Sequence, residues 1–169
     1  MRPDVGIVGA RLYYEDETIQ HAGVVLGFGG IAGHCFVQQP RGNTGYCHRI
    51  ICAQNYSAVT AACMMVKKKA FDEVSGLSTD LAVAFNDIDL CMKFRAAGKK
   101  VVFTPYAELY HYESKSRGLE DTPEKQFRFD KEVKRFEEKW SEQLAKGDPY
   151  YNPNLSVTEG DCSLREDEK

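Results

Sequence analysis

Short apolar runs alternate along this chain with segments that carry the start and stop signals of helices. The runs at residues 5–10, 61–66 and 101–103 are short and bounded by Gly, Thr, Lys or Pro, which is typical of strands buried in a sheet. Between them, Asn86 is a suitable N-cap for a helix over residues 87–97, which Gly98 would end. This alternation predicts an α/β domain with a mixed sheet and flanking helices.

A long amphipathic helix is predicted over residues 122–146. Thr122 is its expected N-cap and Pro123 its first helical residue, and Gly147 ends it. Apolar side chains recur at spacings of four, three, four and four, at Phe129, Val133, Phe136, Trp140 and Leu144. We expect this apolar stripe to pack on the body of the domain.

Length and composition indicate one globular domain. The 169 residues suffice for one core, which we place at residues 1–155, followed by a loosely held polar tail at 156–169. The net charge of −3 gives no general attraction to nucleic acid or to anionic membranes. The chain has no membrane-length apolar run, no signal-peptide pattern and no Cys-x-x-Cys pair among its six cysteines. These features favour the cytoplasm, or the inner face of the membrane, as the location.

Two carboxylates and a histidine are the strongest candidates for chemistry. Asp87 and Asp89 fall in the first turn of the helix that follows Asn86, and His111 comes 24 residues after Asp87. The first turn of a helix also favours negative charge for purely structural reasons, and it makes a carboxylate a weaker base. A return of the chain past Gly98 would bring His111 alongside Asp87.

Other groups allow competing interpretations. Residues 29–54 have no sustained periodicity and are expected to form a lid or an acceptor-facing loop. The cysteines and histidines of this region could bind zinc, but their spacing is not that of a zinc site; they are His34, Cys35, Cys47, His48 and Cys52. Residues 67–69 are all lysine, which fits a phosphate-binding patch less well than a solvated turn.

Seven segments in order resemble the second half of a family 2 glycosyltransferase of the bacterial rhamnosyltransferase-like type. They are residues 4–12, 18–23, 59–64, 76–77, 85–90, 104–114 and 148–155. The resemblance implies a partial GT-A domain, a Rossmann-like α/β fold. It also implies transfer of a sugar, with inversion, from a nucleotide-diphosphate sugar to a glycan acceptor.

The resemblance also implies roles for individual residues. Asp87 would be the catalytic base, and His111 would ligate a Mg²⁺ or Mn²⁺ ion. Substrate would be bound by Thr60, Ala61, Ala62, Gly76, Leu77, Asn86 and Asp89. Asn86 replaces the more common glutamate of the motif, Lys93 replaces a frequent arginine, and Ser75 replaces a frequent glycine.

One departure concerns the region before residue 4. In the family, nucleotide-binding units with an Asp-x-Asp metal motif precede this point, whereas this chain has only three residues there. We therefore expect a shortened transferase that lacks the donor half and has little activity alone. Exposed sheet edges would favour a homodimer or a swapped assembly. Two alternatives remain: a non-catalytic glycan-binding or scaffold domain, and a zinc-stabilised interaction domain.

Overall fold

The computed structural model describes residues 2–112 and 122–165. Its strands are β1 (Val5–Tyr13), β2 (Ile19–His21), β3 (Val24–Leu26), β4 (Ala32–His34), β5 (Gln54–Tyr56), β6 (Met64–Val66) and β7 (Lys100–Tyr110). Its α-helices are α1 (Lys68–Glu73), α2 (Asn86–Ala96) and α3 (Pro123–Lys146). Short 3-10 turns are η1 (Phe28–Gly30), η2 (Tyr46–His48) and η3 (Ala61–Cys63).

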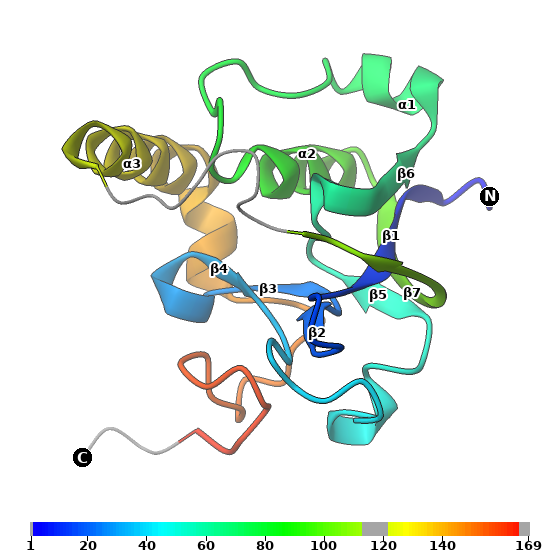
Figure 1. Cartoon of the computed structure of the whole chain (residues 1–169). Coiled ribbons are helices and arrows are strands. Elements are labelled where there is room, and N and C mark those ends of the chain that lie inside the picture. The colour runs from blue at the N-terminus through cyan, green and yellow to red at the C-terminus, as the bar shows by residue number, and fades with distance from the viewer. Residues whose placement is uncertain (1, 113–121, 166–169) are drawn as a thin grey trace.

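A curled mixed sheet is organised around β1, and α2 and α3 lie to one side of it (Figure 1). Its strand order is β2-β1-β7-β5, with β6 also paired to β1. The β1–β7 pair is parallel, whereas β2, β5 and β6 join antiparallel. A separate hairpin is formed by β3 and β4. The predicted α/β class with a mixed sheet and flanking helices is confirmed.

The core forms where α2 and α3 meet the strands. Ile7 on β1, Phe103 on β7, Phe94 on α2 and Phe136 on α3 are all completely buried. The predicted apolar stripe of α3 is buried at Phe136 and Trp140. Phe129, the first residue of the stripe, is instead 41% exposed. The stripe therefore holds α3 to the domain along its second half and leaves an aromatic ring accessible near its start.

The predicted central strand at residues 61–66 is wrong in position and environment. Residues 61–63 form the 3-10 turn η3, and only Met64–Val66 is a strand, paired to one side of β1. Met65 is 67% exposed, as expected of an edge strand rather than a central one. Continuous apolar character alone does not distinguish the two. Pairing of a second copy at this edge stays a prediction.

Two strands predicted on either side of Pro105 are one strand, β7. Ala10 of β1 pairs with Thr104, whereas the next residue, Arg11, pairs with Glu108, so residues 105–107 bulge out of the ladder. Proline has no N–H to donate and is tolerated at such a bulge. The strand therefore continues past Pro105 to Tyr110, directly before His111.

Two segments expected to be irregular are tied to the domain. Within residues 29–54 the structure has β4, η1 and η2, and Arg41 forms ion pairs with Glu17 (2.5 Å) and Glu108 (2.8 Å). The expected polar tail folds back as far as residue 165, because Phe36 N–H donates to Gly160 O (2.8 Å) and Cys162 is buried. Residues 156–165 thus belong to the packed body.

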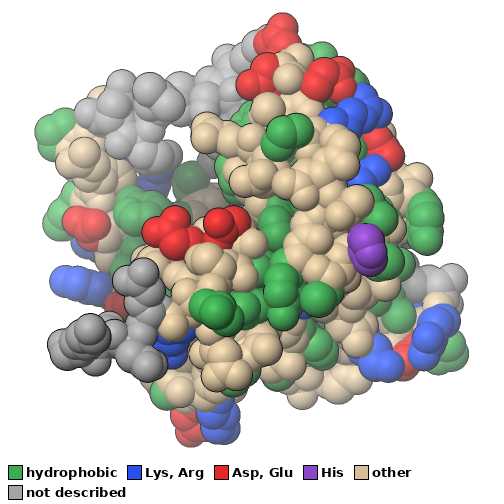
Figure 2. Space-filling model, turned by 90° about the horizontal axis from the view of Figure 1, so that it is seen from below, with side chains coloured by type: hydrophobic (Ala, Val, Ile, Leu, Met, Phe, Trp, Pro, Cys, Tyr) green, Lys and Arg blue, Asp and Glu red, His purple; other side chains and the backbone are tan. Residues whose placement is uncertain are grey.

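Hydrophobic side chains run across the middle of the face seen in Figure 2, with basic side chains toward its edges. Within the part of the chain that the structure describes, no helix has both the length and the apolar character needed to cross a membrane.

Candidate active site

Asp87 lies at the N-terminus of α2 and is held by backbone amides. Its Oδ2 accepts a hydrogen bond from Ala61 N–H (3.0 Å), and its Oδ1 accepts one from Ile88 N–H (2.9 Å). The helix begins at Asn86, so the predicted N-cap is displaced by one residue to Phe85, whose side chain makes no cap hydrogen bond. Phe85 has φ 60°, a conformation that an aromatic residue rarely adopts.

The loop that meets Asp87 contains three predicted substrate-binding residues. Thr60 N–H points to His21 Nε2 (3.5 Å), and Ala62 N–H donates to the Thr60 hydroxyl (3.3 Å). Ala61 and Ala62 are exposed, whereas Thr60 is buried. The structure therefore brings Ala61 against Asp87, with Thr60 and Ala62 on either side of it in the same turn, and their substrate-binding roles stay predictions.

A close packing contact places this loop. A Cβ atom added at Gly9 on β1 would lie 2.5 Å from Val59 Cβ, which is too close for any side chain. Glycine therefore allows Val59 to pack directly on the strand, and the Cys91 thiol of α2 contacts Val59 O (3.6 Å). Residues 60–62 are thus fixed between β1 and the first turns of α2.

Asp89 points away from Asp87 into the interface between α2 and α3. Its carboxylate is completely buried and accepts hydrogen bonds from Trp140 Nε1 (2.8 Å) and Ser78 Oγ (2.6 Å). Lys139 Nζ (2.6 Å) and Lys93 Nζ (3.5 Å) form ion pairs with it. Residues two apart on a helix do not face each other, which explains the divergence. Its predicted substrate-binding role stays untested, but all these contacts are structural.

Charge and hydrogen bonding keep Asp89 ionised. Burial raises the pKa of its carboxyl group, but hydrogen bonds from Lys139, Ser78 and Trp140 outweigh this effect, so the pKa lies below its ordinary value. The ionised carboxylate thereby links α2, α3 and the loop that contains Ser78.

Glu132 of α3 holds the loop that leads into the site, and this role was not predicted. Its Oε1 accepts hydrogen bonds from the N–H groups of Ala82 (3.0 Å) and Val83 (3.2 Å), and its Oε2 accepts one from Ala84 (2.7 Å). The carboxylate is 2% exposed. The signal in the sequence is a glutamate on the apolar stripe, three residues after Phe129.

His111 lies near His21, which itself pairs with His34. His21 is completely buried, and its Nδ1 lies 3.4 Å from Nδ1 of His34. Burial lowers the pKa of His21 well below its ordinary value, and the neighbouring imidazoles of His34 and His111 lower it further. The Nδ1 atom of His111 is buried without a hydrogen-bond partner among the described residues. Asp87 and His111 are therefore connected indirectly, through residues 60–61 and His21.

The described residues do not fit a Mg²⁺ or Mn²⁺ site. No group of three His, Cys, Asp or Glu side chains within residues 2–112 and 122–165 is arranged to hold a metal ion. The side chain shown near His111 is the imidazole of His21, whereas Mg²⁺ prefers oxygen ligands. The described residues likewise contain no such group for zinc. Cys35 is buried, whereas Cys47 and Cys52 are exposed, so these three thiols lie in different surroundings. His111 as a single ligand of a metal held mainly by other groups stays a prediction.

The remaining predicted residues lie on the two ends of the 76–86 segment. Gly76 O accepts a hydrogen bond from Lys93 Nζ (2.9 Å), and Leu77 beside it is 48% exposed. Asn86 is the half-buried first residue of α2. Their binding roles stay predictions.

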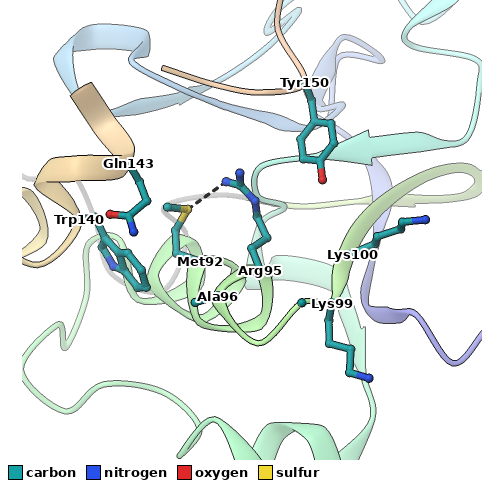
Figure 3. Close-up of a pocket in the computed structure, with 9 residues that line it drawn as sticks. Met92, Arg95, Ala96, Lys99, Lys100, Trp140, Gln143 and Tyr150 are labelled. Atoms are coloured by element: carbon teal, nitrogen blue, oxygen red, sulfur yellow. Dashed lines mark hydrogen bonds between the residues drawn. The ribbon is translucent and has the colours of Figure 1, made fainter. Parts of the chain in front are cut away.

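A basic pocket of about 420 Å³ lies at the opposite end of α2 (Figure 3). Arg95 points toward Tyr150 in this view, whereas Lys99 points away from both. Lys100 forms an ion pair with Asp4 (2.9 Å), and Lys99 Nζ contacts Pro3 O (3.3 Å). Because the three cations do not converge, this pocket is a weaker candidate than the strip around Asp87.

Two curated proteins are similar to nearly the whole chain. An uncharacterized protein, y4gI, of Sinorhizobium fredii (strain NBRC 101917 / NGR234) is 56% identical over 164 residues, which are 96% of this chain and 18% of that protein. The O-antigen biosynthesis protein RfbC of Myxococcus xanthus is 38% identical over 173 residues, covering 97% of this chain and 12% of RfbC. The chain thus spans less than a fifth of either relative. No family model matches it, and neither does a solved structure.

Proposed function

We propose that this chain is the acceptor-side part of a GT-A glycosyltransferase domain of family 2 that acts in cell-surface polysaccharide biosynthesis. The similarity to an O-antigen biosynthesis protein supports the pathway, and the α/β architecture is compatible with the fold. The observation that carries the proposal is the hydrogen bond between Asp87 Oδ2 and Ala61 N–H (3.0 Å). It joins the expected base to the expected acceptor loop.

Asp87 would act as the general base. Each of its oxygens accepts one backbone hydrogen bond and can accept a second, so the carboxylate is oriented without being saturated. It would remove the proton of an acceptor hydroxyl while the hydroxyl oxygen bonds to the anomeric carbon of the donor. The bond from that carbon to the diphosphate breaks with inversion, and the nucleoside diphosphate leaves. Positioning by the fixed loop at residues 60–62 would favour the reactive geometry.

The test is a transfer assay on the full-length protein that contains this chain. Release of nucleoside diphosphate from a panel of nucleotide sugars is measured in the presence of acceptor oligosaccharides. Asp87→Asn is expected to lower turnover by about 10²–10⁴-fold, the usual contribution of a general base. Asp80→Asn is the control, because Asp80 is exposed in the loop before α2.

Near-normal turnover in Asp87→Asn would refute the role of this carboxylate as the base. If the wild-type protein bound oligosaccharide without any transfer, the glycan-binding alternative would replace the enzyme.

A further inference from the structure

We propose that a hollow next to Phe85, the residue that precedes α2, binds a neutral sugar ring of a glycan. We call this hollow the Phe129 pocket. The pocket is enclosed by residues 28–34, Phe85, the first half of α3 and residues 157–160. The inference extends the proposed function, on which its assignment to an acceptor glycan rests. The bound ring would be a unit other than the one that reacts, because Asp87 does not line the pocket.

The Phe129 pocket adjoins the candidate active site at two points. Phe85, two residues before Asp87, forms part of its wall. His34 forms another part, and its imidazole contacts His21 (3.4 Å), which in turn faces Thr60 N–H. The volume of about 590 Å³ falls in the range of roughly 300–1,000 Å³ that is usual for small-ligand sites. The pocket therefore shares Phe85 and His34 with the surroundings of the candidate active site.

Aromatic rings supply the apolar part of the site. Phe129 is 41% exposed although it belongs to the apolar stripe of α3. Its ring lies 5.7 Å from that of Phe85, which in turn lies 5.4 Å from the buried ring of Phe136. The C–H face of a pyranose ring is apolar and carries partial positive charge, so it packs well on the negative face of an aromatic ring. Phe136 and the Glu132 carboxylate fix the position of Phe85 and its loop.

Acidic groups supply the polar part. Asp130 and Glu137 lie seven residues apart, on one face of α3, and both are exposed. Neither takes part in a hydrogen bond or ion pair within the described part of the chain. A carboxylate only accepts hydrogen bonds, which suits sugar hydroxyl groups. The described residues that line the pocket include no Lys or Arg, and two of them are acidic, so among these residues nothing would attract a phosphate or a uronic acid.

The test is saturation-transfer NMR on the chain with methyl pyranosides of glucose, galactose, mannose and rhamnose. The matched anionic probe is the methyl glycoside of glucuronic acid. At least one neutral glycoside is expected to receive saturation through its ring C–H groups and to bind more tightly than the uronate. Phe129→Leu, which keeps the side chain apolar, should weaken this binding about threefold to tenfold, as expected for the loss of a ring contact.

Control variants separate the pocket from the rest of α3. Phe127 lies two residues before Phe129 and is 62% exposed. Its ring packs under Lys131 and does not line the pocket, so Phe127→Leu should leave sugar binding unchanged. Glu137→Gln should improve binding of the uronate relative to the neutral sugar, and Glu138→Gln should not.

Three results would overturn the proposal: no binding of any neutral probe, equal effects of Phe127→Leu and Phe129→Leu, or equal binding of the uronate. Binding is measured without donor or transfer, so this test is separate from the turnover assay. Sugar binding that depends on Phe129 could therefore persist if Asp87 proved not to be the base. Transfer that depends on Asp87 could likewise persist if the pocket bound nothing.

Discussion

Asp87 and Asp89 lie two residues apart on α2, yet their surroundings are opposite. Asp87 is half-buried, is held by two backbone amides and keeps unused acceptor capacity. Asp89 is completely buried, and Ser78, Lys93, Lys139 and Trp140 surround it. Because α2 turns between them, one carboxylate faces a loop and the other faces a second helix. The Asp87 carboxylate is therefore suited to chemistry, and the Asp89 carboxylate to holding the helices together.

The largest expected difference between the two aspartates is in stability. Asp89→Asn should lower the free energy of unfolding by about 3–5 kcal/mol, because removal of the charge leaves the largely buried Lys93 without a counter-ion and sets an amide N–H against the donors of Trp140 or Ser78. Asp87→Asn should lower it by about 1–2 kcal/mol, since a favourable charge at a helix N-terminus is lost and the amide N–H is set against the N–H of either Ala61 or Ile88 at a half-buried site. Equilibrium unfolding in urea measures both.

Asp72→Asn serves as the surface control for these unfolding experiments. Asp72 is exposed and pairs with Lys68 (2.5 Å) on one face of α1. Such pairs contribute about 0.5 kcal/mol or less. Equal losses of stability for Asp87→Asn and Asp89→Asn would contradict the division of roles.

An intermediate effect is expected for Glu132→Gln. The amide group would set an N–H donor against one of the three backbone N–H groups that the carboxylate now satisfies, which should cost about 1–3 kcal/mol. Hydrogen exchange of the amides of residues 82–84 should speed up, because their acceptor is weakened. The matched control is Glu138→Gln, on an exposed part of the same helix. Unchanged exchange at these amides would show that Glu132 does not hold the loop.

The smallest expected effect is the pH dependence of the stability that Asp89 contributes. The pKa of Asp89 in the folded chain lies below the ordinary value of 3.8, so the unfolded chain takes up a proton first as the pH falls. Its stabilising contribution is therefore complete above that value and is lost as the pH drops through the folded pKa. The stability difference between the wild type and Asp89→Asn should shrink between pH 7 and about pH 2. A constant difference would assign the stabilisation to packing rather than charge.

The helices could be predicted because their signals are local. Thr122 caps α3 as expected, and its Oγ1 accepts from Lys125 N–H (3.4 Å). The last helical residue of α2 is Ala96, one before the predicted end. The strands were harder, because pairing partners determine whether a run such as residues 61–66 is central, at an edge or a turn. Whether a run is central, at an edge or a turn depends on partners far apart in sequence, so a local pattern does not predict it.

The candidate site was likewise predicted only where local sequence or the family resemblance contained the signal. The family resemblance assigned Asp87 and residues 60–62 to one site, and the hydrogen bond between Asp87 and Ala61 agrees with this. The hydrogen bonds that tie Glu132 and His21 to the loops of the site span 39 to 50 residues of sequence, and the exposure of Phe129 depends on a face of α3 that the described residues leave uncovered. The periodicity of α3 does place Glu132 on the packed face, so a buried carboxylate there could have been anticipated. Its partners could not.

The bulge at Pro105 separates the two halves of β7 mechanically. Residues 101–104 keep one register with β1 inside the core, whereas residues 108–110 pair with β1 after a step of three extra residues. His111 N–H continues this second register by donating to Tyr13 O (2.9 Å). Insertions or deletions within 105–107 would therefore change the size of the bulge while Phe103 and His111 both keep their places along β1. A change of chain length at this surface position is absorbed before it reaches either the core or the histidine.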